Sequence, residues 1–239
     1  MNLTIDIGNT RTKIGVFNQK NLLTVLTFDN SKEINLKEII SNFDIQQSII
    51  SGTIEIPKYI LEALKELPNH LILDTNTRLP FQNNYSSKDT LGKDRLALIA
   101  AAQANYPNQN NLVIGCGTCI TFNFINAKNE FLGGSIHPGL KMRLKAMHTF
   151  TGKLPLVELE NNADLIGNDT KSNMLAGVLV AASKEIDGMI DEYLVKFPEM
   201  NIIITGGDAD FLVYRLKNEI FAVPNFTLMG LNHILEYNA

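Results

Sequence analysis

One pattern occurs twice in this chain, and it limits the folds that the chain can adopt. Near the start, the apolar run "LTIDI" (3–7) is followed by "GNT" and then by a second apolar run, "TKIGVF" (12–17). At residue 111 the same order returns in "NLVIGCGTCITFNFI" (111–125). Glycine and asparagine favour tight turns and β-branched residues favour strands, so each stretch predicts a β-hairpin.

The segments after each hairpin repeat as well. A third strand pattern (22–28) precedes a helix pattern in "EINLKEIISNF", a buried strand pattern in "QQSIISGT" and a helix pattern in "IPKYILEALKELP". In the second half a third strand, a helix, a long helix over 169–197 and the strand "MNIIIT" follow in turn, and after the double glycine "DADFLVYRL" (208–216) predicts another helix. This repeat predicts a duplicated α/β fold, with domains at residues 1–108 and 109–239.

The first hairpin has two interpretations. Asp6, Gly8 and Thr10 form a D-x-G-x-T pattern, in which glycine lets the backbone approach a phosphate and the acid holds a metal ion through water. The alternative is a plain hairpin whose polar residues cap the turn. One such turn favours the plain hairpin slightly. A second copy of the turn makes a phosphate site, with a nucleotide cleft between the domains, the better reading.

Composition argues against several functional classes. The net charge is −4 and no basic run occurs, which argues against a protein that coats nucleic acid. We expect no secretory leader, no membrane-spanning segment and a cytoplasmic location. Cys116 and Cys119 form a C-x-x-C pattern, for which half a zinc site, a redox pair and a simple turn are open, and the turn is favoured.

An ordered set of short motifs resembles the type III pantothenate kinases, a family of the acetate-kinase, sugar-kinase, Hsp70 and actin superfamily. The resemblance extends over nearly the whole chain, and only the ordered set is specific. The motifs are "DIGNTRTK" (6–13), "GKDR" (92–95), "GCGTCIT" (115–121), "GGSIHPGL" (133–140), "LP" (154–155), "GNDT" (167–170) and "TGGDA" (205–209).

The resemblance implies two tandem RNase H-like (actin-like ATPase) domains and an enzyme that transfers the γ-phosphate of ATP to the 4′-hydroxyl of pantothenate. That reaction is the first step of coenzyme A synthesis. By similarity, Asp6 is oriented at Mg²⁺, and Thr118, Gly206 and Gly207 contact ATP from the second domain. The segment that binds the phosphates comprises Asp6, Ile7, Gly8, Asn9, Thr10, Arg11, Thr12 and Lys13.

The resemblance also implies a pantothenate site. Asp94 is the general base and Arg95 a cation that holds the substrate. The other substrate contacts implied are Tyr85, Gly92, Lys93 and Thr170. From the residues alone, the favoured reading of Asp94 is an acid of the first helical turn that interacts with the helix dipole. Arg95 is also explained as a solvated arginine of that turn.

Two positions depart from the family. The family usually has an aspartate at the position of Gly115, where it takes part in binding potassium or ammonium, and Asn123 stands where many superfamily members have an acid. We therefore expect activity without added potassium.

The family resemblance also implies a homodimer. The alternatives are a non-catalytic regulatory or binding relative and another kinase or ATPase of the superfamily; the "GKDR" motif favours the pantothenate kinase.

Overall fold

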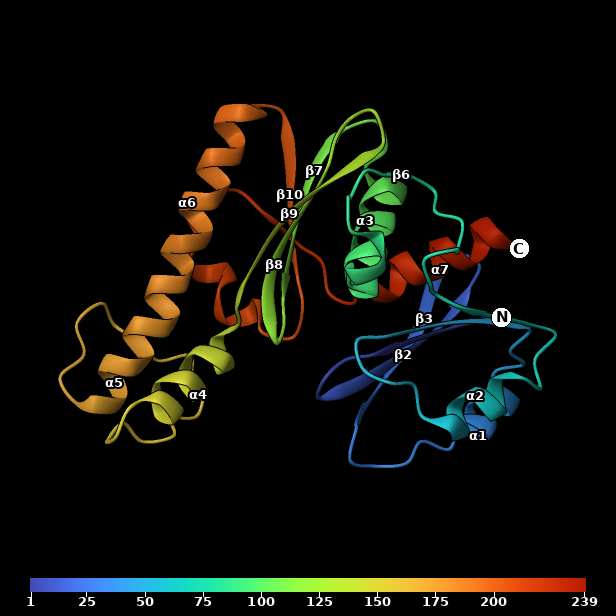
Figure 1. Ribbon diagram of the computed structural model, residues 1–239, viewed down its shortest axis with the longest axis horizontal. Helices are drawn as coiled ribbons and strands as arrows, with labels where there is room; N and C mark the ends of the chain where they lie inside the picture. The colour runs from blue at the N-terminus through green and yellow to red at the C-terminus, as the bar shows by residue number, and fades with distance from the viewer. The chain divides into compact units, whose positions relative to one another are not determined.

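The computed structural model describes residues 1–239 (Figure 1). The chain forms two compact units, which are described separately. Unit 1 comprises Met1–Pro107, Asn129–Leu132 and Asn225–Ala239. Unit 2 comprises Asn108–Lys128 and Gly133–Pro224.

Unit 1 is built on a mixed five-stranded sheet. Its strands are β1 (Asn2–Ile7), β2 (Arg11–Asn18), β3 (Asn21–Asp29), β4 (Gln47–Gly52) and β5 (Asn69–Ile72). Their order in the sheet is β3-β2-β1-β4-β5, with β1 antiparallel to β2 and parallel to β4. The helices α1 (Leu36–Asn42) and α2 (Lys58–Leu64) pack their apolar residues against Leu3, Ile5 and Ile7 of β1. The central strand β1 is therefore almost fully buried.

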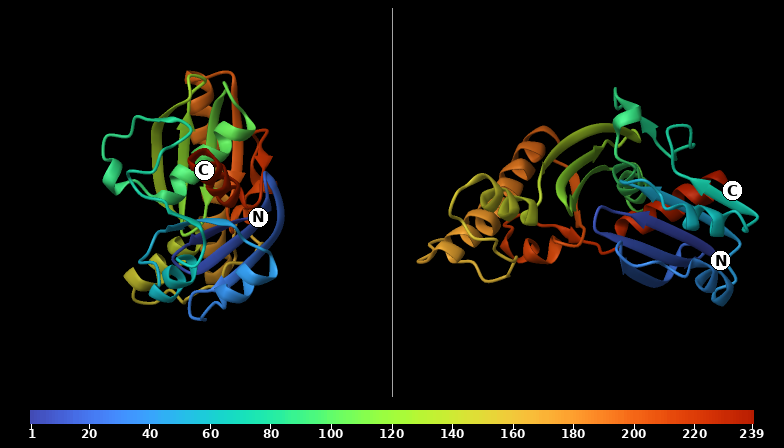
Figure 2. Two further views of the ribbon diagram at one scale, coloured as in Figure 1. Left: turned by 90° about the vertical axis from the view of Figure 1, so that its right-hand side faces the viewer. Right: turned by 60° about the horizontal axis from the view of Figure 1, so that its bottom comes forward.

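The helices α3 (Lys93–Asn105) and α7 (Phe226–Asn238) complete unit 1. α7 packs on α3 and against β1, β2 and β4, and Figure 2 shows it in red beside the blue strands. Two small residues allow this approach: a Cβ at Gly230 would lie 1.7 Å from the carbonyl oxygen of Ala97. The sequence predicted that residues 109–239 form the second domain. In the structure α7 belongs to unit 1 instead, because its apolar face is buried there.

Unit 2 repeats the strand order of unit 1. Its strands are β7 (Asn110–Cys116), β8 (Cys119–Ile125), β9 (Glu130–Pro138), β10 (Met200–Thr205) and β11 (Phe221–Ala222). They are arranged β9-β8-β7-β10-β11, with β7 antiparallel to β8 and parallel to β10. The short strand β6 (Gln82–Asn83) pairs with Glu130 and Phe131, the part of β9 that belongs to unit 1. The duplication predicted from the two hairpins is thus present in the sheets.

The helices of unit 2 are α4 (Leu140–Phe150), α5 (Thr170–Leu175) and α6 (Ala181–Lys196). A π-helical segment, η2 (Ala176–Val180), joins α5 to α6, so the long helix expected over 169–197 is present with one wider turn. None of the helices combines the length and apolarity needed to cross a bilayer.

The segment after β10 is not the helix that the sequence predicts. It forms two 3₁₀ turns, η3 (Ala209–Phe211) and η4 (Val213–Arg215), and a third, η1 (Lys88–Thr90), lies in unit 1. The guanidinium of Arg215 donates to the carbonyl oxygens of Ala163 at 3.0 Å and Asn161 at 2.9 Å. These bonds attach the segment to the preceding loop, which favours short turns over a continuous helix.

Candidate active site

The turn between β1 and β2 holds most of the predicted phosphate-binding residues. The backbone N–H of Gly8 donates to the carbonyl oxygen of Arg11 at 3.0 Å, which closes the turn. Asn9, Thr10 and Arg11 are exposed, whereas Ile7 and Thr12 on either side are buried in the sheet. The sheet thus presents a short polar turn to solvent, a geometry in which backbone N–H groups can bind an anion.

Asp6 lies at the end of β1 and is half-buried. The hydroxyl of Ser51, on the parallel strand β4, donates to its Oδ1 at 3.1 Å. Burial, and next the negative charge of Asp94, raise the pKa of Asp6 to about 6, against the hydrogen bond from Ser51 and the charge of Lys13. A carboxylate in this setting gains from a nearby cation, because a cation favours its charged form.

Asp94 lies in the first turn of α3, which begins after Gly92. A Cβ at residue 92 would lie 2.5 Å from Oδ1 of Asp94, so glycine leaves space for the carboxylate beside the backbone. Burial raises the pKa of Asp94, while the backbone N–H of Arg95 and the Arg95 charge oppose the rise. A raised pKa suits a group that accepts a proton near neutral pH.

Arg95 is buried among aromatic rings although it is charged. Its guanidinium carbon lies 5.5 Å from the centre of the Tyr85 ring and 5.8 Å from that of Phe131. The rings of Tyr85 and Phe131 stack on each other with centroids 6.1 Å apart. Because stacked faces attract a guanidinium, the two rings fix the direction of Arg95. Lys93 precedes Asp94 and Arg95 on α3 and is half-buried.

Unit 2 holds the other predicted residues. Thr118 lies exposed in the turn between β7 and β8, and its carbonyl oxygen accepts the backbone N–H of Gly139 at 3.1 Å. Gly206 and Gly207 follow β10, and Gly206 has φ 108°, a left-handed conformation that favours glycine. Thr170 is exposed at the start of α5, in a different segment of unit 2 from Thr118 and the two glycines.

Gly115 and Asn123, where the resemblance led us to expect an acid, lie within the sheet of unit 2. Gly115 pairs with Thr121 on β8 and Thr205 on β10. The amide of Asn123 is buried and donates to the carbonyl oxygen of Val113 and to the hydroxyl of Thr121, both at 3.1 Å. Asn123 thus serves to bridge neighbouring strands, with no carboxylate at either position.

The C-x-x-C pattern is a turn, as favoured from the sequence. Cys116 ends β7 and Cys119 begins β8, and both thiols are free. Burial, and then the charge of Asp208, raise the pKa of the Cys116 thiol to about 12, so this thiol stays protonated and unreactive at neutral pH. No cluster of three or more histidine, cysteine and acidic side chains forms a metal site.

Three residues of the site were missed in the sequence. Ser51 bonds to Asp6, Phe131 stacks on Tyr85, and Asn225 accepts Lys13 Nζ at 3.5 Å. Ser51 had a signal, since it follows the buried run "SII" at the end of a strand parallel to β1. Phe131 and Asn225 are remote in the chain from the residues that they contact and lie in no motif.

One family model, described as type III pantothenate kinase, matches residues 2–192. A type III pantothenate kinase of Christiangramia forsetii is 43% identical, and the alignment covers 100% of this chain and 99% of that protein. A Bacteroides fragilis protein of the same name is 40% identical over 100% of this chain and 98% of its own length.

Solved structures share the fold. A Campylobacter jejuni protein assigned to the Baf family of transcriptional activators gives a TM-score of 0.63 at 22% identity, over 99% of this chain and 98% of that one. Similarity of this degree establishes the fold alone, which is that of the actin-like ATPases and sugar kinases. The family model and the full-length relatives together establish more: this chain belongs to the type III pantothenate kinase family.

Proposed function

We propose that this chain transfers the γ-phosphoryl group of ATP to the 4′-hydroxyl of pantothenate, with Asp94 as the general base. Membership of the family supports the activity. One structural observation carries the assignment of the base: Asp94, at the start of α3, acts on the pKa of Asp6, at the end of β1. Asp6, the carboxylate proposed to hold Mg²⁺, and Asp94, the proposed general base, therefore interact electrostatically within unit 1.

Phosphoryl transfer depends on positioning and on neutralising charge more than on covalent chemistry. In this proposal the segment from Asp6 to Lys13 binds the ATP phosphates. The family resemblance also implies Thr118, Gly206 and Gly207 as ATP-binding residues. Asp94 accepts the proton of the 4′-hydroxyl as the oxygen attacks phosphorus. Arg95, held by its aromatic neighbours, binds the pantothenate carboxylate through its fork of N–H donors. Tyr85, Gly92 and Lys93 are the other proposed substrate contacts of unit 1, and the family resemblance also implies Thr170.

Asp6 is the residue that fits Mg²⁺. Magnesium in kinase sites is bound through one or two carboxylates together with substrate phosphates and water, so a single half-buried carboxylate is sufficient. When bound, the ion neutralises charge on the phosphates. In its absence, the raised pKa of Asp6 keeps part of its population protonated near neutral pH.

Incubation of the purified protein with ATP, Mg²⁺ and pantothenate tests the proposal. We expect ADP and 4′-phosphopantothenate in equal amounts, measured by mass spectrometry and a coupled ADP assay. ADP without a phosphorylated product would indicate an ATPase, phosphorylation of a sugar would indicate a different kinase, and no ADP would indicate a non-catalytic relative. We place the reaction in the cytoplasm.

Potassium should not be required. Gly115 offers no side-chain oxygen, and neither Gly115 nor Asn123 carries a carboxylate that could bind the ion. We therefore propose that turnover in sodium buffer equals turnover in potassium buffer to within about twofold, a difference of ~0.4 kcal/mol in the barrier. A strict requirement for potassium or ammonium would contradict this proposal.

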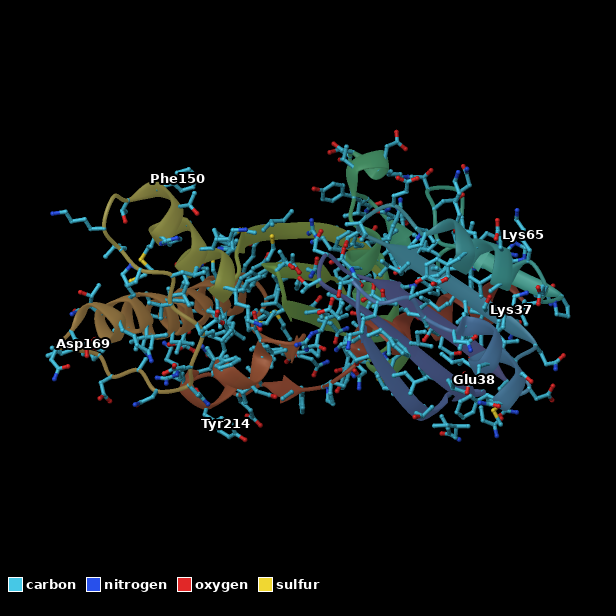
Figure 3. The ribbon with its side chains drawn as sticks, turned by 90° about the horizontal axis from the view of Figure 1, so that it is seen from below. Lys37, Glu38, Lys65, Phe150, Asp169 and Tyr214 are labelled. Carbon is cyan, nitrogen blue, oxygen red and sulfur yellow. The ribbon has the colours of Figure 1, made fainter.

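We also propose a homodimer, as the family resemblance implies. Unit 2 exposes several large apolar side chains, which is a feature of interaction surfaces. Phe150 at the end of α4 is 85% exposed, and Figure 3 shows it at the margin of unit 2. The others in this part of the chain are Ile136, Met142, Leu156, Leu165 and Ile166. Sedimentation at working concentration should give the mass of a dimer; Phe150→Ser with Leu165→Ser should shift it toward the monomer, whereas a monomeric parent would contradict the proposal.

A further inference from the structure

The phosphate turn is held by a residue from outside its own hairpin. Asn30 follows the last residue of β3 and makes three hydrogen bonds to the turn. Its side-chain N–H donates to the carbonyl oxygen of Gly8 at 2.8 Å. Its side-chain oxygen accepts the hydroxyl of Thr12 at 2.8 Å, and its backbone N–H donates to the carbonyl oxygen of Thr10 at 3.2 Å.

These bonds connect both sides of the turn. Gly8 lies where the chain leaves β1, and Thr12 lies where it enters β2. An exposed turn closed only by its own backbone has few contacts that limit its motion. An amide that bonds to both sides restrains their separation, and with it the spacing of the N–H groups between them.

Asn30 is itself fixed by a local turn. The side chain of Asp29 accepts a hydrogen bond from the backbone N–H of Ser31 at 2.9 Å. The carbonyl oxygen of Asp29 accepts one from the backbone N–H of Lys32 at 3.0 Å. Asp29 in turn pairs with Arg11 at the end of the ladder between β2 and β3. The backbone on both sides of Asn30 is therefore held by hydrogen bonds and by the strand ladder.

We propose that Asn30 is a positioning residue for ATP, which holds the turn from Gly8 to Thr12 in the shape that binds the phosphates. The inference rests on the proposed role of the Asp6–Lys13 segment in ATP binding. The amide is specific to this task, because it donates to a carbonyl oxygen and accepts from a hydroxyl at once. An aspartate keeps the acceptor and loses the donor, and an alanine loses both.

Steady-state kinetics with ATP and pantothenate varied separately test the proposal. We expect Asn30→Ala to raise KM for ATP about five- to tenfold, since each of the two lost side-chain bonds is individually modest. The KM for pantothenate should stay within about twofold of the parent, because the pantothenate contacts are on other elements. Asn30→Asp should raise KM for ATP further, because a carboxylate repels both the Gly8 carbonyl oxygen and the phosphates.

Asn21 provides matched controls, because it is an exposed asparagine at the opposite end of β3. Asn21→Ala and Asn21→Asp make the same truncation and add the same charge away from the turn. Both should leave KM for ATP near that of the parent. Thermal unfolding of each variant shows whether the fold is retained, and binding of AMP should be insensitive to Asn30→Ala, because AMP lacks the β- and γ-phosphates.

Lys13→Met separates failure of this inference from failure of the proposed ATP site. If Lys13→Met raises KM for ATP and Asn30→Ala does not, the hairpin binds phosphate and the role of Asn30 is overturned. If neither variant changes it, the phosphate role of the hairpin is wrong and the role of Asn30 falls with it. If Asn30→Ala raises both KM values and lowers the unfolding midpoint, its role is structural and the proposal is again overturned.

Discussion

Replacing Asp94 with asparagine is expected to lower kcat by a factor of about 10²–10⁴, the usual contribution of a positioned general base. The amide is nearly the same shape as the carboxylate but cannot accept the proton of the 4′-hydroxyl. ATP binding should persist, since the phosphate turn lies on other residues. Rapid-quench measurement of 4′-phosphopantothenate, together with ATP titration by calorimetry, gives both quantities.

The variant should not lose stability, which distinguishes a chemical role from a structural one. Burial raises the pKa of Asp94, so the charged form is disfavoured in the folded protein and a neutral side chain relieves that cost. Asp89→Asn is the matched control, because Asp89 is an exposed acid in η1, three residues before Gly92. Turnover by Asp94→Asn equal to that of Asp89→Asn would remove Asp94 from the role of base.

The sequence predicted the fold well because its signals were local and repeated. The two hairpins and the helix patterns after them predicted the order of elements along the chain and its duplication, although not the order of the strands within each sheet. The domain boundary at 108 and 109 did not anticipate that α7 packs in unit 1. Hydrophobic periodicity shows that a helix has a buried face, but it does not show which partner covers that face.

The candidate site was predicted where its residues form motifs and missed where they act through space. "DIGNTRTK" and "GKDR" are continuous, so the roles of Asp6 and Asp94 could be proposed from the family resemblance of these motifs. Ser51, Phe131 and Asn30 are joined to those motifs by hydrogen bonds and ring contacts between residues far apart in sequence. Such contacts depend on strand register and on the packing of loops, which no single segment of sequence encodes.

Replacing Gly230 with alanine is expected to destabilise unit 1, although alanine is the better helix former by about 1 kcal/mol. The added Cβ would lie 1.7 Å from the carbonyl oxygen of Ala97 and 3.1 Å from the backbone nitrogen of Ala101. Both atoms belong to the backbone of α3, so no side chain can rotate away. The two helices must separate, and overpacking of this kind costs ~1–3 kcal/mol or more, which exceeds the gain in helix propensity.

Gly188→Ala is the matched control for Gly230→Ala and should have the opposite sign. Gly188 is an exposed residue of α6 with no atom within 4 Å of an added Cβ, so only the helix propensity changes there. The urea concentration at the midpoint of unfolding, followed by circular dichroism, should be lower for Gly230→Ala and slightly higher for Gly188→Ala than for the parent.

Because α3 also carries Asp94, hydrogen exchange along 93–105 should rise in Gly230→Ala, and kcat should fall with it. A Gly230→Ala variant as stable as the parent would contradict the close packing of α7 on α3.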